Sequence, residues 1–298
     1  MSVPAAYIGI ILIWSTTPLA IKWSSEGAGY MFGVTSRMAL GLFVCLLLVA
    51  LFSRRMPWHK QAVKTYLAAG LGLWGAMVTV YWGALHIPSG LISVVYGFLP
   101  VVTGVMGAYW LGEQAFTPFK SLGMLLGIVG LAVIFDQAGG GPELVIAGLV
   151  AVVVSVHIQA ASTVWVKRIA AGLPPLETTT GTLLVALPLF SLSWWYMGSG
   201  WPEAIDTRAT WSIVYLGVIG SVLGFILYFY VLHHVEASKV ALVTLITPIL
   251  ALMIGQWLND EIITAKDWLG AVTILIGLAS YLGGDQLFRR VAERGVVK

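Results

Sequence analysis

Two stretches of the sequence repeat one another, LPVVTGVMGAYWLGE (99–113) and TPILALMIGQWLNDE (247–261). In both, a proline is followed seven residues later by a glycine, and a glutamate closes the stretch. The next segment repeats as well, since LGMLLGIVGLA (122–132) returns as LGAVTILIGLA (269–279). Such self-similarity at a fixed spacing indicates a chain built from two related halves.

The composition is typical of a chain embedded in a membrane. Apolar residues make up 59% of the 298 positions and charged residues only 10%, against about 25% charged in soluble domains. The single cysteine, Cys45, excludes an internal disulfide and a metal site built from several thiolates. The net charge of +3, without a basic run, gives no indication of nucleic-acid binding. We expect no metal and no cofactor.

Ten apolar segments are long enough to cross a bilayer, which takes roughly 20 helical residues. They are continuously apolar rather than alternating, which favours helices over a β-barrel. We therefore expect an all-α membrane protein, with a first five-helix repeat at 1–137 and a second at 138–298. The expected spans are 4–23, 31–52, 64–85, 88–110, 119–136, 144–166, 178–197, 210–232, 238–258 and 267–286.

Lysine and arginine residues predict the orientation. With the N-terminus in the cytoplasm, only Lys22, Arg208 and Lys266 of the 16 basic residues fall outside, and Arg37 lies within a span. Because cytoplasmic loops are enriched in Lys and Arg, both termini are expected in the cytoplasm. Five spans per half, an odd number, make the repeats inverted, which is how many transporters build two interconvertible faces around a central site.

Polar and aromatic residues at membrane depth are the candidates for substrate contact. Most tryptophans fall near span ends, but Trp14 and Trp74 lie near mid-span, where they either line a cavity or pack between helices. Arg37 either snorkels toward the outer surface or has a structural role, which is the interpretation we favour, or it binds a substrate carboxylate. His157 is the histidine expected deep in a span, as a proton-exchanging group or as a packing residue.

Two further patterns extend the candidate site. Gln159 lies with Ser155 and Ser162 on one helical face, which His157 does not share. Stripes of small and polar residues with a proline in the middle run along the fourth and ninth spans. The residues of these stripes are Ser89, Ser93, Tyr96, Pro100, Thr103 and Gly107, and Ala237, Ala241, Thr244, Pro248, Ala251 and Gly255. We add Tyr96, Thr244 and Thr17 to the candidate cavity residues.

Proline can kink a helix near mid-membrane and leave a carbonyl free for a ligand. Pro18, Pro100 and Pro248 are therefore hinge candidates. Tyr81 and Tyr228 are candidates for gate residues at opposite membrane faces, or else interfacial anchors. Glu113 and Glu261 follow the fourth and ninth spans, where turn formation and helix N-terminal electrostatics explain them.

The repeated proline–glycine–glutamate block, with the LG…G segment after it, resembles the EamA repeat of the drug/metabolite transporter superfamily. The resemblance covers nearly the whole chain and implies export from the cytoplasm through a central cavity between the repeats. Within the superfamily, the chain is similar to bacterial exporters of aromatic amino acids. The resemblance implies no ligand-binding residues, because this broad family has no fixed ligand signature.

These observations predict a bacterial inner-membrane exporter of aromatic and other hydrophobic or neutral amino acids that works by alternating access. The expected partners are a small-molecule substrate and the lipid bilayer; the oligomeric state is not readable. The alternatives are a broad drug or metabolite exporter, an intramembrane enzyme, or a scaffold that transports nothing. Phosphorylated substrates fit poorly, because phosphate needs several Lys or Arg residues. No carboxylate is expected in the middle of a span, which favours facilitated diffusion or a weak proton linkage through His157.

Overall fold

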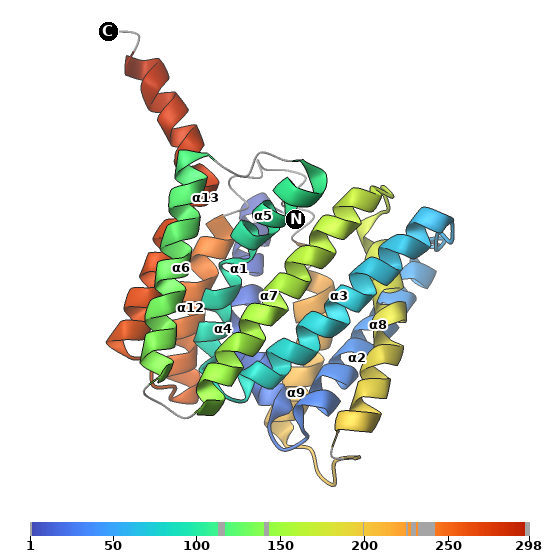
Figure 1. The fold of residues 1–298 in the computed structure, drawn as a ribbon. Helices are drawn as coiled ribbons and strands as arrows, with labels where there is room; N and C mark the ends of the chain where they lie inside the picture. The colour runs from blue at the N-terminus through green and yellow to red at the C-terminus, as the bar shows by residue number, and fades with distance from the viewer. Residues whose placement is uncertain are drawn as a thin grey trace.

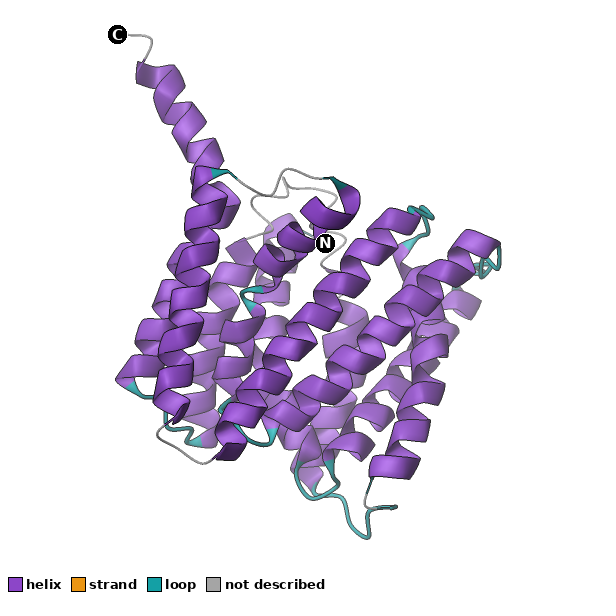
Figure 2. Ribbon diagram, in the orientation of Figure 1, coloured by secondary structure: helices purple, strands orange, loops and turns teal. Residues whose placement is uncertain are grey.

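The computed structural model describes residues 2–112, 117–139, 143–198, 200–224, 226–227, 231 and 242–295. Among them are eight helices long and apolar enough to cross a membrane and two shorter apolar ones, Thr207–Leu223 and Val243–Asn259. Short loops join the helices (Figure 2). The prediction of an all-helical membrane protein with ten spans is confirmed.

The helices follow the order of the predicted spans. The first repeat contains α1 (Val3–Ser25), α2 (Tyr30–Leu51), α3 (Lys60–Ala84), α4 (Ser89–Tyr96), α5 (Leu99–Leu111) and α6 (Pro118–Gly139). The second contains α7 (Glu143–Ile169), α8 (Pro175–Met197), α9 (Thr207–Tyr215), which continues as the π-helix η1 (Leu216–Leu223), α12 (Leu242–Asn259) and α13 (Ala265–Gly295).

Local sequence signals explain where these helices begin and end. A continuous apolar run becomes a helix because in lipid each backbone N–H and C=O group needs a partner within the segment. The Oγ1 atom of Thr264 accepts a hydrogen bond from the Asp267 N–H at 3.2 Å, and the Asp267 carboxylate accepts from the Thr264 N–H at 2.9 Å. This reciprocal capping begins α13. Gly112, at φ 70°, ends α5 in the left-handed conformation that favours glycine.

The fourth predicted span is interrupted in the structure. Helix α4 ends at Tyr96 and α5 begins at Leu99, with Gly97 and Phe98 between them. Pro100 has no N–H, so it cannot donate the helical hydrogen bond to the Tyr96 carbonyl. The equivalent Pro248 lies inside α12, which continues through it. The proline predicted to kink this part of each repeat therefore coincides with a break in the first repeat only.

Equivalent helices of the two repeats pack against each other, α2 against α8, α4 against α12 and α6 against α13. At the α6–α13 crossing, a Cβ atom on Gly123 would lie 2.5 Å from the Gly277 carbonyl oxygen, and one on Gly130 would lie 2.7 Å from that of Gly270. Gly123 is the counterpart of Gly270, and Gly130 that of Gly277, so the two contacts are related by a two-fold axis. The repeats are thus inverted.

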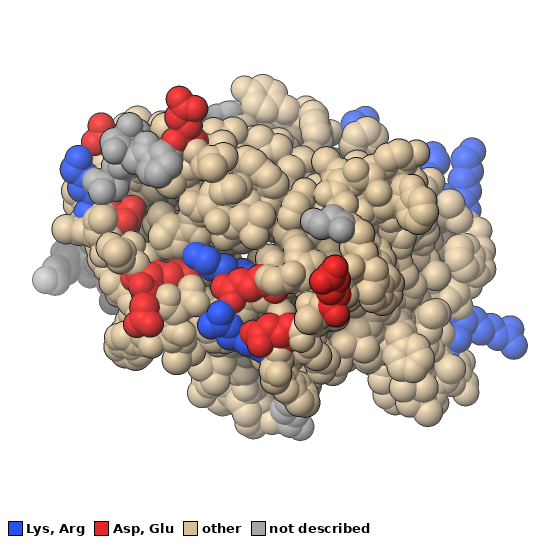
Figure 3. Space-filling view, turned by 90° about the horizontal axis from the view of Figure 1, so that it is seen from below, with Lys and Arg blue, Asp and Glu red and all other residues tan. Residues whose placement is uncertain are grey.

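The two ends of the molecule differ in charge. Helix α1 begins and α13 ends at one end (Figure 1), which we call the inner end because the positive-inside rule assigns it to the cytoplasm. At the opposite, outer end, acidic side chains gather beside basic ones (Figure 3). The described acidic residues in the loops and helix ends there are Glu26, Asp136, Glu143, Glu203, Asp206, Asp260, Glu261 and Asp267.

Candidate functional site

A central cavity between the repeats consists of two adjoining compartments, since Arg37 and Met77 line both of them. The first, the apolar compartment, has a volume of about 210 Å³. The second, the hydroxyl compartment, has a volume of about 490 Å³ and extends to the α7–α8 connection at the inner end. The cavity therefore reaches from the middle of the helix bundle to the inner end.

The apolar compartment is built by α1, α2, α3, α4, the break after α4, and α12. Apolar and aromatic side chains dominate its wall: Trp14, Ile21, Met77, Val80, Ile92, Tyr96 and Leu99. Thr17, Pro18 and Thr244 also line it, so four of the seven predicted cavity residues and one predicted hinge residue meet here. The Thr17 hydroxyl donates to the Ile13 carbonyl at 2.7 Å, which leaves its oxygen only as an acceptor.

The hydroxyl compartment is lined mainly by α3, α7 and α8, and Gln159 is the predicted cavity residue that lies in it. Its polar neutral side chains are Thr65, Gln159, Ser162, Thr163, Thr178, Thr179, Thr182 and Ser221. Most of these hydroxyls donate to their own helix, for example Thr182 to the Thr178 carbonyl at 2.7 Å. Such hydroxyls present oxygen atoms to the cavity at low cost in a membrane interior.

Tyr96 is fixed by a hydrogen-bond chain across three helices. The Ser155 hydroxyl donates to the Ala76 carbonyl at 2.6 Å, so its single proton is used. In the 2.6 Å contact between Tyr96 and Ser155, the Tyr96 hydroxyl must therefore be the donor. The chain holds the Tyr96 ring in one orientation at the apolar wall.

Two predicted cavity residues, Trp74 and His157, are not among the side chains that line either compartment. The indole Nε1 of Trp74 donates to Ser193 Oγ at 2.8 Å, which places Trp74 in the α3–α8 contact. Its neighbours Leu73 and Met77 face the cavity instead. His157 is exposed, and its Nδ1 donates to the Val153 carbonyl at 2.8 Å within the same helix.

The residues predicted to act as gates or hinges have different surroundings. Tyr81 is fully buried, and its hydroxyl accepts from the Arg37 Nη1 atom at 3.3 Å. The break at Pro100 borders the apolar compartment through Tyr96, Gly97 and Leu99. A Cβ atom on Gly97 would lie 3.7 Å from the Pro248 ring, so the central prolines of both repeats lie near this break. Tyr228, like Glu113, is outside the described residues.

Arg37 is the residue whose placement departs most from the sequence interpretation. Its side chain does not snorkel outward, because only 7% of the residue is exposed and it lines both compartments. The Nε atom donates to Ser221 Oγ and the Nη1 atom to the Tyr81 hydroxyl, both at 3.3 Å. The sequence signal that Arg37 could face a cavity was the presence of a charged side chain within a span.

Contacts around Glu261 close the outer end. Its side chain is 4% exposed and forms an ion pair with Lys22 at 3.2 Å. The carboxylate accepts hydrogen bonds from the Ser89 N–H at 2.8 Å and the Ser89 hydroxyl at 2.9 Å. Asn259 donates to the same carboxylate at 3.0 Å and accepts from the Trp23 indole at 2.8 Å. We call Lys22, Trp23, Ser89, Asn259 and Glu261 the outer cluster.

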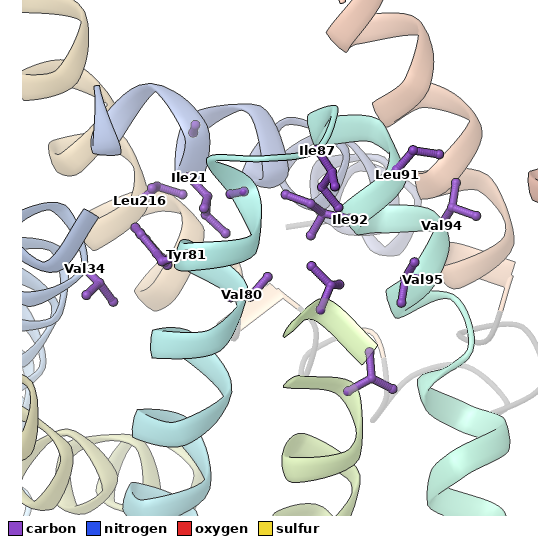
Figure 4. Close-up of a cluster of buried hydrophobic side chains, with 14 of the residues drawn as sticks. Ile21, Val34, Val80, Tyr81, Ile87, Leu91, Ile92, Val94, Val95 and Leu216 are labelled. Atoms are coloured by element: carbon purple, nitrogen blue, oxygen red, sulfur yellow. The ribbon is translucent and has the colours of Figure 1, made fainter. Parts of the chain in front are cut away.

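The outer cluster joins residues of different repeats, so turn formation and helix electrostatics do not fully account for Glu261. Ile21, Val80 and Ile92, which line the apolar compartment, belong to a layer of packed buried apolar side chains (Figure 4). These packed side chains and the partly buried Lys22–Glu261 ion pair separate the apolar compartment from the outer end. Among the described residues, no group of three His, Cys, Asp or Glu side chains could hold a metal ion.

Comparison with known proteins agrees with this architecture. An "Uncharacterized transporter" of Archaeoglobus fulgidus is 26% identical over 90% of this chain and 94% of its own length. The "Probable terminal-alkyne amino-acid exporter" of Streptantibioticus cattleyicolor is 26% identical, covering 86% of this chain and 85% of that protein. The "Probable amino-acid metabolite efflux pump" of Escherichia coli is 24% identical, covering 90% of this chain and 91% of that protein.

A solved crystal structure superposes with a TM-score of 0.65, covering 94% of this chain and 97% of that one. Its sequence identity is 18%, so this likeness shows the fold alone. The model of the EamA-like transporter family matches both halves, at residues 4–136 and 146–282. The chain is therefore a multi-pass membrane protein that belongs to the EamA-like transporter family, which is a family of transporters and not of enzymes.

Proposed function

We propose that this transporter exports neutral amino acids with apolar or aromatic side chains across the bacterial cytoplasmic membrane. The observation that carries the proposal is the division of the central cavity into two compartments. One is walled by apolar and aromatic groups such as Trp14 and Tyr96, and the other by hydroxyl groups and Gln159. An amino acid with an apolar side chain is divided in the same way, into an apolar side chain and a polar backbone part that carries the amino and carboxylate groups.

The same geometry supports an alternating-access mechanism for this export. The cavity extends to the inner end, whereas the outer cluster and the apolar layer separate it from the outer end. This is the state in which a substrate from the cytoplasm would bind. Export then requires the outer cluster to open and the inner end to close, through rearrangement of the two inverted repeats around the site.

The size of the apolar compartment supports a small substrate. Pockets for drug-sized ligands usually measure about 300–1,000 Å³. The hydroxyl compartment, at about 490 Å³, lies within that range, whereas the apolar compartment, at about 210 Å³, is smaller and suits one side chain. The relatives in Streptantibioticus cattleyicolor and Escherichia coli, named for amino-acid export or efflux, also support this substrate class over broad drug export.

Counterflow in proteoliposomes tests the proposal. Vesicles containing the purified protein are loaded with unlabelled phenylalanine, leucine or threonine, and labelled amino acid is supplied outside without an ion gradient. We expect labelled phenylalanine and leucine to accumulate more strongly than threonine. A folded protein that accumulates none of the three, or whose exchange is inhibited by unrelated drugs but not by amino acids, would contradict the proposal.

A further inference from the structure

Arg37 carries a buried positive charge that no acidic side chain among the described residues neutralises. The residue is 7% exposed and lies in α2, facing the cavity. The ion pairs within the described residues join Lys22 to Glu261, Arg208 to Glu26 and Lys266 to Asp136, and none of them involves Arg37. Burying a charge without a partner costs free energy. A guanidinium group stays charged in proteins, so Arg37 cannot avoid that cost by losing a proton.

The hydrogen bonds of Arg37 fix the group without using all of its donors. Ser221 and Tyr81 supply neutral oxygen atoms at 3.3 Å, which is longer than the usual 2.9–3.0 Å for such bonds. The Nη2 atom has no acceptor among the described residues, yet no unpartnered polar side-chain atom there is fully buried. The Nη2 group is therefore accessible from the cavity.

The position of Arg37 matches the boundary between the two compartments. Arg37 and Met77 are the two residues that line both of them, so the guanidinium lies where the apolar wall meets the hydroxyl wall. The described lining of both compartments contains no other charged side chain. One fixed positive charge favours a ligand that brings one negative charge, because a buried unpaired charge is costly.

We propose that Arg37 binds the carboxylate of the transported substrate, an inference that rests on the proposed amino-acid transport and makes its ligand more specific. The planar guanidinium pairs with a carboxylate through two parallel hydrogen bonds, and Nη2 supplies donors for them. The apolar part of the substrate then enters the apolar compartment beside Trp14 and Tyr96. The ligand class is a monocarboxylate with a compact apolar group, and ligands without a carboxylate are disfavoured.

Binding measurements on the full-length protein in detergent test this assignment without transport. The probes are 3-phenylpropionate, which has a carboxylate and no amine, L-phenylalaninamide and 2-phenylethylamine, titrated by calorimetry. We expect wild-type protein to bind 3-phenylpropionate at least about tenfold more tightly than either amine, because charge-assisted hydrogen bonds replace repulsion. Equal affinity for the acid and the amide would overturn the assignment.

The matched variants are Arg37→Gln, Arg37→Lys and Arg208→Gln, the last removing an arginine from the outer surface. Arg37→Gln should weaken 3-phenylpropionate binding about 10- to 100-fold and abolish the preference for the acid, and Arg37→Lys should restore part of it. Arg208→Gln should change neither. If Arg37→Gln fails to fold, the affinities of the wild type and of Arg37→Lys for 3-phenylpropionate and L-phenylalaninamide still test the assignment.

The binding and counterflow results separate the two proposals. Phenylalanine exchange that persists in folded Arg37→Gln with unchanged affinity overturns the carboxylate assignment and leaves amino-acid export standing. Arg37-dependent binding of 3-phenylpropionate, in a protein that exchanges no amino acid, supports the carboxylate assignment and contradicts amino-acid export.

Discussion

Replacing Glu261 with glutamine is expected to favour opening of the outer end. In the structure, one carboxylate oxygen accepts both hydrogen bonds from Ser89, at the start of α4, and the other contacts Lys22 and Asn259. Glutamine offers one acceptor oxygen in place of two. If that oxygen keeps the Ser89 bonds, the amide nitrogen faces two donor groups, Lys22 Nζ and Asn259 Nδ2.

The size of the effect follows from these contacts. Hydrogen bonds to a charged group contribute about 1.5–3 kcal/mol and neutral ones about 0.5–1.5 kcal/mol, so each Ser89 bond weakens by about 1 kcal/mol. Loss of the Lys22 ion pair, whose carboxylate is 4% exposed, brings the total to roughly 2–3 kcal/mol. At 1.4 kcal/mol per factor of ten, the equilibrium shifts about 30- to 150-fold toward outward opening.

The assay measures access to the cavity from outside. Thr17→Cys is introduced with Cys45→Ala, and labelling by a membrane-impermeant thiol reagent is timed in right-side-out vesicles. We expect Glu261→Gln to accelerate labelling by tenfold or more. Glu26→Gln is the matched control, because Glu26 pairs with Arg208 on the same face at exposed positions, where ion pairs contribute about 0–1 kcal/mol. Equal labelling rates in Glu261→Gln and wild type would refute the reasoning.

Three further predictions concern the cavity wall, the helix break and the repeat contact. Trp14→Ala should reduce amino-acid affinity in calorimetry with little change in unfolding temperature. Trp74→Ala loses the hydrogen bond to Ser193, so it should lower the unfolding temperature and leave amino-acid affinity unchanged. The reverse pattern would contradict both placements. Pro100→Ala and Pro248→Ala should slow counterflow in folded protein, and unchanged rates would argue against hinges at these positions. Gly130→Ala should destabilise the protein by about 1–3 kcal/mol, since its Cβ would lie 2.6–2.7 Å from Ile274 and the Gly270 carbonyl, while Gly283→Ala, with no heavy atom within 4 Å, should have little effect in thermal unfolding.

The fold was readable from the sequence because the bilayer sets the length of each span. Ten apolar runs predicted ten spans, the two copies of the proline–glycine–glutamate block predicted two related halves, and the odd number of spans in each half predicted their inversion. The effect of each proline was less readable. Pro100 coincides with a break and Pro248 does not, although the two occupy equivalent places, since the surrounding packing decides whether a helix continues.

The candidate site was only partly readable, because periodicity does not tell which face of a buried helix meets the cavity. Met77 and Leu73 face the cavity and Trp74, next to Leu73, does not, a difference of about 100° around α3. Arg37 could be recognised as a charge in a span, but its direction depends on Ser221 and Tyr81, which are distant in sequence.

The outer cluster could not be predicted for a related reason. Lys22 and Ser89 lie 239 and 172 residues from Glu261 in the chain. No local sequence pattern predicts a contact between residues so far apart in the chain. The sequence placed Glu261 correctly after a span, but only the packing of α1, α4 and α12 shows that its carboxylate is buried.

The glycine crossing of α6 and α13 has an evolutionary consequence. Gly123 meets Gly277 and Gly130 meets Gly270, so each repeat presents the same patch to the other. A single five-helix unit could make this contact with a second copy of itself inserted upside down, because a two-fold interface is self-complementary. Gene duplication and fusion would then join two copies that already packed against each other in opposite orientations. Lysine and arginine residues in the loops would determine the membrane orientation of each half.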